Sequence, residues 1–391
     1  MIFTLEALQA KHGDSLLLHY GTKTAPKLIV IDGGPQGVFD TSLRPRLEEI
    51  KKKRSPQKPL PIRLMMVSHI DDDHIRGILD LTDALIEQQD NNESLLCNIT
   101  TLWHNSFDDI LGNNETAAIS ASLNSVVKLS ATGELSFPPS LFHDSAPAAI
   151  AANVPQGRRL RGNAEALALL PNDPFETLVV LPQKNKKPLS IDGKLKFTVL
   201  GPSQTRLEKL QKDWDSKIKP KIETAKPAEA RALAASFIDN SVYNLSSIVV
   251  LAEADGKRML LTGDGLGADI LAGLKEEGLL EDSGTLHLDL LKMPHHGSKR
   301  NITEEFLNTV TADHYVISAN GRDDNPDLDT LKLLSKVRGA SNCTIHLTNP
   351  VPHAVKFFST DKKKAGKKYK VEIREDPALS LRVDLGDPFK D

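Results

Sequence analysis

The chain concentrates metal-ligating side chains at residues 69–74, where two histidines and three aspartates stand in the order His-Ile-Asp-Asp-Asp-His. The cluster closely follows the apolar run 64–67, Leu-Met-Met-Val. Imidazole nitrogens and carboxylate oxygens together bind divalent ions of hard to intermediate character. A loop with these donors at the end of a buried strand is therefore typical of a metal site. An acidic loop with two incidental histidines is the alternative.

Two further segments place ligand types just after an apolar strand. Asp264 lies between two glycines after the strand-like run 258–262, and His295 and His296 follow the run 288–293. Taken singly, each reads more readily as an ordinary turn or loop. Together they predict a two-metal hydrolytic site, in which bound ions lower the pKa of water from about 15.7 to about 7. The candidate ligands are His69, Asp71, Asp73, His74, Asp264 and His295.

The elements that must position these residues alternate between β and α patterns, which predicts an α/β protein. We find no internal repeat and no clear linker, so a single domain over 1–391 is expected, with an insertion at about 105–195. The predicted strands are 3–8, 15–20, 27–31, 64–67, 99–104, 194–200, 246–253, 258–262, 288–293 and 315–318. The predicted helices are 43–53, 75–88, 204–217, 228–237 and 268–277.

Composition narrows the class of protein. The 391 residues carry a net charge of −3, which argues against a general electrostatic coat for nucleic acid. The two cysteines, Cys97 and Cys343, form no pairing or zinc-binding pattern. No window approaches the roughly 18 apolar residues of a membrane span, and no signal peptide is recognisable. The sequence thus predicts a cytoplasmic protein without membrane contact.

The motifs as a set resemble those of metallo-β-lactamase-fold hydrolases, and are most similar to the soluble domain of bacterial DNA-uptake competence proteins. They occur in that family's order. The resemblance implies an α/β fold of the four-layer αβ/βα sandwich type, with a helical insertion. The matching stretches are His12-Gly13-Asp14-Ser15, Ile31-Asp32-Gly33-Gly34, Ser68 to Gly77, Asn244-Leu245-Ser246-Ser247, Leu261-Thr262-Gly263-Asp264 and Pro294-His295-His296-Gly297-Ser298.

The resemblance also implies roles for single residues. His69 and Asp71 would bind a first metal ion, Asp73 and His74 a second, and Asp264 would bridge them. His295 is expected as the last ligand, and His296 would then contact a ligand or the substrate; the reverse assignment stays open. Asp73, Asp264 and His296 are the residues expected to act in the reaction. Asp14 and Asp32 either support the site loops or are plain turn residues.

Two departures from the wider superfamily affect the metal. Asp71 stands where many members have histidine, which favours Mn²⁺ or Mg²⁺ relative to Zn²⁺. Asn244 stands near the place of another histidine ligand, so one site is weaker or fills only with substrate. His104 is a possible replacement donor, although a structural role is favoured. Ser318, Asn320 and His353 are further candidates for the cleft, or ordinary loop residues.

The expected activity is hydrolysis by a metal-bound hydroxide, with one or two Zn²⁺ or Mn²⁺ ions as cofactor. A phosphodiesterase or nuclease is favoured, acting on nucleic acid or a small phosphodiester. Lys292, Lys299, Arg300 and Arg76 flank the clusters and are candidates for phosphate contacts. The alternatives are a hydrolase of a small ester, lactone, thioester or cyclic nucleotide, and a metal-stabilised binding module without turnover.

Overall fold

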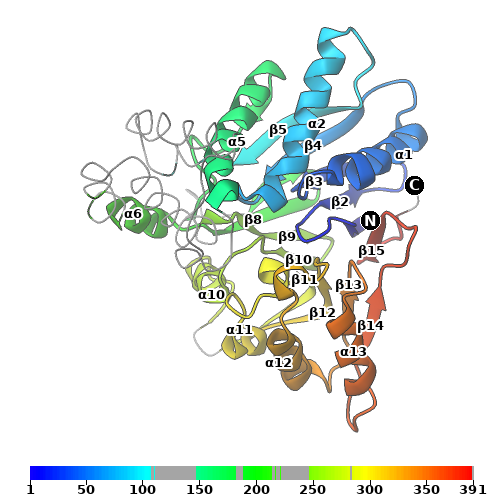
Figure 1. The fold of residues 1–391 in the computed structure, drawn as a ribbon, viewed down its shortest axis with the longest axis vertical. Coiled ribbons are helices and arrows are strands. Elements are labelled where there is room, and N and C mark those ends of the chain that lie inside the picture. The colour runs from blue at the N-terminus through cyan, green and yellow to red at the C-terminus, as the bar shows by residue number, and fades with distance from the viewer. Residues whose placement is uncertain are drawn as a thin grey trace.

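The computed structural model describes residues 1–106, 110, 147–181, 188–213, 216, 221, 246–281 and 284–389. Its strands form two mixed sheets, one of seven strands and one of eight. Figure 1 shows the first sheet with its helices in the upper half and the second with its helices in the lower half. This confirms the α/β class predicted from the sequence. Residues 107–109, 111–146 and 182–187 of the insertion predicted at 105–195 lie outside the described residues, and so does the whole helix predicted at 228–237.

The first sheet has the order β15-β1-β2-β3-β4-β5-β6. Strands β15, β1, β2 and β3 are antiparallel neighbours, whereas β3 to β6 run parallel. The parallel part places the ends of β3 and β4 at one edge of the sheet, and the 69–74 cluster leaves from that edge. The bounds are β1 Ile2–Leu8, β2 Leu16–Gly21, β3 Pro26–Ile31, β4 Leu60–Val67, β5 Cys97–His104, β6 Leu170–Pro171 and β15 Ser380–Asp384.

The second sheet has the order β14-β13-β12-β11-β10-β9-β8-β7 and is parallel from β14 to β10. Asp264 follows β10 and the His295–His296 pair follows β11, so both leave the same edge of this sheet. The bounds are β7 Leu189–Asp192, β8 Leu195–Gly201, β9 Val249–Ala254, β10 Lys257–Leu261, β11 Leu286–Lys292, β12 Val310–Ile317, β13 Thr344–Leu347 and β14 Lys370–Ile373.

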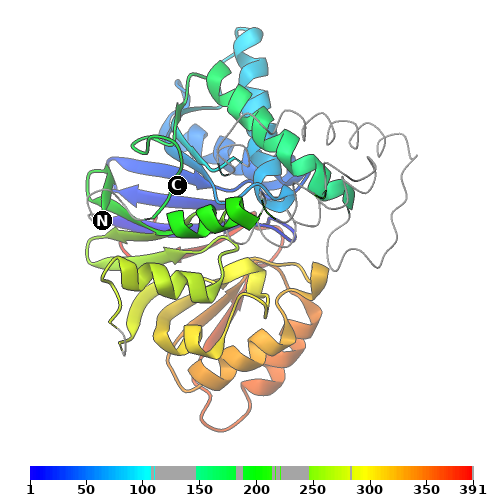
Figure 2. The same cartoon turned by 90° about the vertical axis from the view of Figure 1, so that its left-hand side faces the viewer.

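The helices cover the outer faces of the sheets, as the turned view in Figure 2 shows. A central apolar core joins the inner faces of both sheets, and it includes Phe3, Trp103 and Phe197. Two outer cores lie beneath the helices. The helices are α1 Arg44–Arg54, α2 Asp72–Asp90, α5 Pro147–Ala166, α6 Gln204–Asp213, α10 Gly267–Glu276, α11 Glu304–Thr309, α12 Leu328–Arg338 and α13 Pro352–Asp361.

Helix α2 begins three residues earlier than predicted. Asp73 and His74 are therefore in its first turn rather than in a loop, and Asp71 occupies the position before the helix with extended backbone angles. The helix dipole favours the acidic residues Asp72 and Asp73 at this end. The early start fixes the spacing of Asp73 and His74, because consecutive helical residues point in directions about 100° apart.

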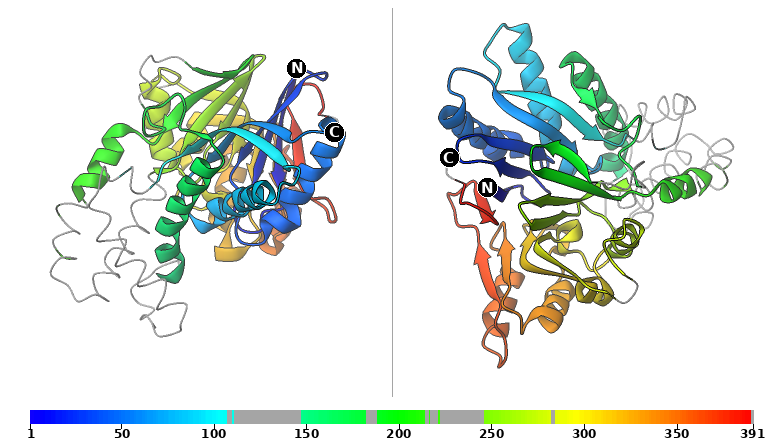
Figure 3. Two further views of the ribbon diagram at one scale, coloured as in Figure 1. Left: turned by 90° about the horizontal axis from the view of Figure 1, so that it is seen from above. Right: turned by 180° about the vertical axis from the view of Figure 1, so that it is seen from behind.

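Helix α5 lies beside α2, as Figure 3 shows from above. Gln156 donates to the Asp72 side chain at 3.0 Å, and Asn163 donates to Thr82 at 2.9 Å. The described part of the predicted insertion thus supports the helix that carries Asp73 and His74. Among the helices in the described ranges, none is long and apolar enough to cross a lipid bilayer.

Candidate metal centre

Six of the predicted site residues converge around the carboxylate of a seventh, Asp264. This group is buried, and its two oxygens face different neighbours. Oδ1 lies 3.3 Å from His74 Nε2 and 3.7 Å from His296 Nε2. Oδ2 lies 3.4 Å from His295 Nε2 and 3.7 Å from His69 Nε2. The carboxylate therefore stands between two pairs of imidazoles.

The carboxylates of Asp71 and Asp73 lie on opposite sides of Asp264. Asp71 Oδ2 is 3.4 Å from His69 Nε2, on the Oδ2 side, and Asp73 Oδ2 is 3.3 Å from His296 Nε2, on the Oδ1 side. Asp73, His74 and His296 offer ligand atoms within 4.8 Å of one another, as do His69, His74 and Asp264. His295 belongs to no such compact group within the described chain. The Oδ1 side is thus the tighter half.

The other ring nitrogen of each histidine is held by an oxygen atom. Nδ1 of His74 lies 2.9 Å from Asp32 Oδ2, and Nδ1 of His69 lies 3.1 Å from Ser68 Oγ. Nδ1 of His295 lies 2.9 Å from Asn301 Oδ1. Nδ1 of His296 lies 2.9 Å from the Ser318 carbonyl oxygen. Such partners orient a histidine ligand and leave Nε2 free for an ion.

Three features of the buried atoms fit a divalent ion here. Nε2 of His69 and Oδ1 of Asp264 are buried and make no hydrogen bond. Nε2 of His74 faces Nε2 of His296 at 3.3 Å, where neutral rings protonated on Nδ1 would oppose two lone pairs. An ion between the donors relieves this repulsion and satisfies the orphaned atoms. The mixture of nitrogen and oxygen donors suits zinc or manganese.

Electrostatic coupling within the cluster is strong. Burial alone raises the pKa of Asp264, but the surrounding imidazoles, His295 foremost, hold that pKa well below its usual range. Burial alone lowers the pKa of His296, yet Asp264 and Asp14 raise it to about 10. The residues thus compensate one another's charge, and protons on the imidazoles compete with a metal ion for the same atoms.

Local backbone geometry explains how the segments approach so closely. Gly263 has φ +48°, and a Cβ there would lie 2.9 Å from Ser68 Cβ, so glycine allows the Asp264 turn to pack on the 68–74 segment. His295 and His296 both have left-handed backbone, at φ 46° and 56°. Such conformations cost about 1–3 kcal/mol per residue and concentrate at functional sites. The two left-handed residues direct neighbouring rings to opposite sides of Asp264.

Asp14 and Asp32 support the centre, which favours the first of the two interpretations drawn from the sequence. Asp32 also accepts hydrogen bonds from the Ser68 backbone and hydroxyl, both at 2.7 Å. Asp14 pairs with the buried ammonium of Lys292 and lies 3.5 Å from His296 Nδ1. No sequence pattern indicates this role of Lys292, which was predicted as a candidate for phosphate contacts. It is fully buried and cannot reach a substrate outside.

The other candidates from the sequence occupy different places. His104 is buried, belongs to none of the compact donor groups of the described chain, and has its pKa lowered to about 3 by burial and Arg161. His353 bonds to the Pro326 carbonyl at 2.8 Å. Ser318 serves through its carbonyl, as the partner of His296. Asn244 lies outside the described residues.

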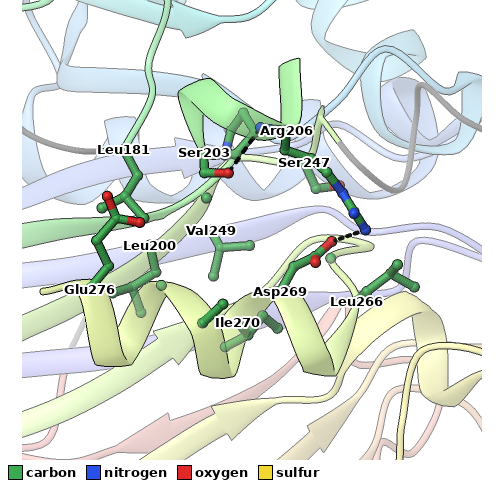
Figure 4. A pocket seen from close by; sticks show the side chains of 15 residues that line it. Leu181, Leu200, Ser203, Arg206, Ser247, Val249, Leu266, Asp269, Ile270 and Glu276 are labelled. Atoms are coloured by element: carbon green, nitrogen blue, oxygen red, sulfur yellow. Dashed lines mark hydrogen bonds and ion pairs between the residues drawn. The ribbon is translucent and has the colours of Figure 1, made fainter. Parts of the chain in front are cut away.

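A separate pocket lies beside the Asp264 turn, between α6 and α10 (Figure 4). Leu200, Val249 and Ile270 provide apolar walls, and Arg206 pairs with Asp269 across it at 2.9 Å. None of its lining residues is a donor of the metal centre. Ser247 links the two features, because its hydroxyl accepts a hydrogen bond from the Asp264 backbone N–H at 3.2 Å.

Substituting Asp32 tests whether its contacts matter for metal binding. We expect Asp32→Asn to weaken metal affinity about 10- to 100-fold, since an amide keeps only one of the two acceptor oxygens that hold Ser68 and His74. Asparagine tolerates the left-handed backbone at this position, φ 56°, so the turn should persist. Competition with a chromophoric chelator measures the affinity. Asp40→Asn, at an exposed carboxylate, is the control, and equal affinities in both variants would contradict the role of Asp32.

Comparison with known proteins gives partial matches. No family model matches the chain. ComE operon protein 3 of Bacillus subtilis (strain 168) is 33% identical over 100 residues, which is 25% of this chain but 12% of that protein's length. The solved structure of a protein named "Putative metal-dependent hydrolase", from Parabacteroides distasonis ATCC 8503, aligns over 94% of this chain and 92% of its own, with 10% identity and a TM-score of 0.32. Structural likeness at that level assigns neither a family nor an activity.

Proposed function

We propose that this chain is a metal-dependent hydrolase of the metallo-β-lactamase fold, which holds a pair of divalent ions and cleaves phosphodiesters. The observation that carries the proposal is the arrangement of four imidazoles. Each has Nδ1 fixed by an oxygen atom and Nε2 directed toward the Asp264 carboxylate. The partial match to ComE operon protein 3 supports the resemblance of the motifs to the DNA-uptake competence branch of this superfamily.

The ligand set follows from the two sides of Asp264. His69, Asp71 and His295 would hold one ion with Oδ2, and Asp73, His74 and His296 would hold the other with Oδ1. This revises the assignment made from the sequence, in which only one histidine of the His295–His296 pair was a ligand. His295 then takes the place of the donor that seemed to be missing from the first site.

In the proposed reaction, the metal ions and the protein side chains have different roles. Bound ions would lower the pKa of a water molecule to about 7 and stabilise both the attacking and the leaving oxygen of a phosphodiester. The protein would hold the ions through Asp264, and its Nδ1 partners keep each imidazole in one tautomer. Asp71, Asp73 and His295 remain partly exposed, with side chains 27%, 23% and 28% accessible, so the open face of the centre lies on their side.

The charged residues around the centre suit a small substrate with a single phosphodiester better than a long nucleic acid. Of the cations predicted to contact phosphates, Lys292 is buried, and Arg76 lies 3.4 Å from Asp80. Lys299 lies 3.9 Å from Asp329. Arg300, the fourth of these cations, is exposed. The contacts of the other three leave little of a continuous basic surface beside the centre. Affinity for long nucleic acid would fall steeply with added salt, whereas the affinity for a small substrate would respond weakly.

The direct test combines metal analysis with an assay. We expect the purified protein to bind a pair of divalent ions per chain. It should also hydrolyse bis-p-nitrophenyl phosphate in the presence of Mn²⁺, Mg²⁺ or Zn²⁺. Chelation should abolish turnover, and metal should restore it. Bound metal without hydrolysis of phosphodiesters, small esters, lactones or cyclic nucleotides would point to a binding module instead. Failure to bind any metal would reject the proposal.

A further inference from the structure

A loop from the first sheet packs against the start of α2, beside the metal centre. Residues 9–15 join β1 to β2, and Gly13 presses on the start of α2, where a Cβ would collide with the Asp73 carbonyl. The Asp14 backbone donates to the same carbonyl at 3.2 Å. Ser318, at the end of β12, donates to the Gly13 carbonyl at 2.7 Å. The loop is thus fixed from both sides, and His12 is held at the rim of the centre.

Arg322 approaches His12 from the other end of the chain. It follows β12 in a turn that begins at Gly321, and its Nη1 donates to His12 Nε2 at 2.8 Å across 310 positions of sequence. Asp323 is a second, looser neighbour at 3.5 Å from Arg322 Nε. The Arg322 side chain is 61% exposed, which leaves N–H donors of its fork open to solvent. Lys11, the other nearby cation, turns away and donates to the Gln36 carbonyl.

The pair stands within electrostatic reach of the proposed ligands. Burial lowers the pKa of His12, and the charges that act on the ring next include Asp73, Arg322 and His296. The Arg322 contact to Nε2 uses the lone pair of a neutral ring, which keeps His12 uncharged and its proton on Nδ1. A guanidinium and an imidazole N–H therefore lie at one rim of a centre whose partly exposed groups include the carboxylates Asp71 and Asp73 and the ring of His295.

We infer that Arg322, positioned by His12, binds an oxygen of the anionic phosphoryl group that the metal centre receives. This inference rests on the proposed function and names the residue that favours a phosphate ester over a neutral ester. Ions in the centre can contact only the phosphoryl oxygens directed toward them. The planar donor fork of arginine suits the remaining outward oxygens, and it stays charged throughout the working pH range.

The test measures binding without turnover. Phenylphosphonate carries a phosphoryl anion but has no P–O–C bond to cleave, so calorimetric titration into Mn²⁺-loaded protein reports anion affinity alone. We expect Arg322→Gln to weaken binding about tenfold or more, with unchanged metal content. Arg322→Lys should retain part of the affinity, and His12→Ala should cause a smaller loss than Arg322→Gln. Lys363→Gln removes a charge from an exposed residue after α13 and should bind like the wild type.

Every result decides the inference. Equal phenylphosphonate affinity in the wild type and Arg322→Gln would overturn it, as would no binding to the wild type. An equal loss in Lys363→Gln would also overturn it, because the effect would then come from net charge alone. The proposed function fails in a different way, through lack of hydrolysis by a protein that still binds the anion in an Arg322-dependent manner.

Discussion

Asp264→Asn should reduce phosphodiester hydrolysis by about a thousandfold or more, the largest change expected for any single residue of this chain. Among the residues that the structure describes, this carboxylate is the group whose two oxygens face the two halves of the centre, and an amide offers one acceptor oxygen in place of two. The fold should persist, because the local contacts of residue 264 use its backbone: the N–H bonds to Ser247 and the carbonyl accepts from Asn301 at 2.8 Å. Steady-state kinetics and elemental analysis of the same preparation provide the measurement.

Asp269→Asn is the matched control for this substitution. Asp269 lies on α10, close in sequence to Asp264, but its partner is Arg206 in the separate pocket. The control should retain the metal content and turnover of the wild type. If Asp264→Asn kept both ions and its activity, Asp264 would not bridge them, and the division of ligands between its two oxygens would be wrong.

Lys292→Met should lower the free energy of unfolding by about 3–5 kcal/mol, because it leaves the Asp14 carboxylate buried without its ammonium partner. Lys292 is fully buried, and its remaining polar contact is the Gly263 carbonyl at 3.4 Å. Methionine fills a similar volume, so the loss would come from the unpaired charge rather than from a cavity. Urea unfolding with chelator present measures the effect without a contribution from bound metal.

A double substitution and a surface lysine control this result. Adding Asp14→Asn to Lys292→Met should recover part of the lost stability, since the uncompensated carboxylate is removed. Lys257→Met breaks an ion pair with Asp289 in which the lysine is 47% exposed, and should cost less than about 1 kcal/mol. Similar losses of stability in Lys292→Met and Lys257→Met would show that the buried Lys292–Asp14 pair stabilises the fold no more than an exposed ion pair does.

Local patterns predicted the strands that lead to the site with small errors at their ends. The hairpin of β9 and β10 has Asp255 and Gly256 at its turn, both with positive φ, as an Asp-Gly pair predicts. The start of α2 was placed too late, although Asp71 followed by two acidic residues is a signal for a helix N-terminus. The elements after residue 320 were missed, and β15 pairs with β1 from the opposite end of the chain.

Residue types and their spacing were enough to predict which side chains could bind a metal ion. Each donor group follows an apolar strand, and strand ends are readable because side-chain alternation and turn residues are local properties. The division of the donors between the two oxygens of Asp264, in contrast, became visible only once the segments were packed together. The left-handed backbone of His295 and His296, the burial of Lys292 against Asp14, and the Arg322–His12 contact all depend on segments far apart in the chain. No local pattern encodes them, because their geometry is set by the packing of two sheets against each other.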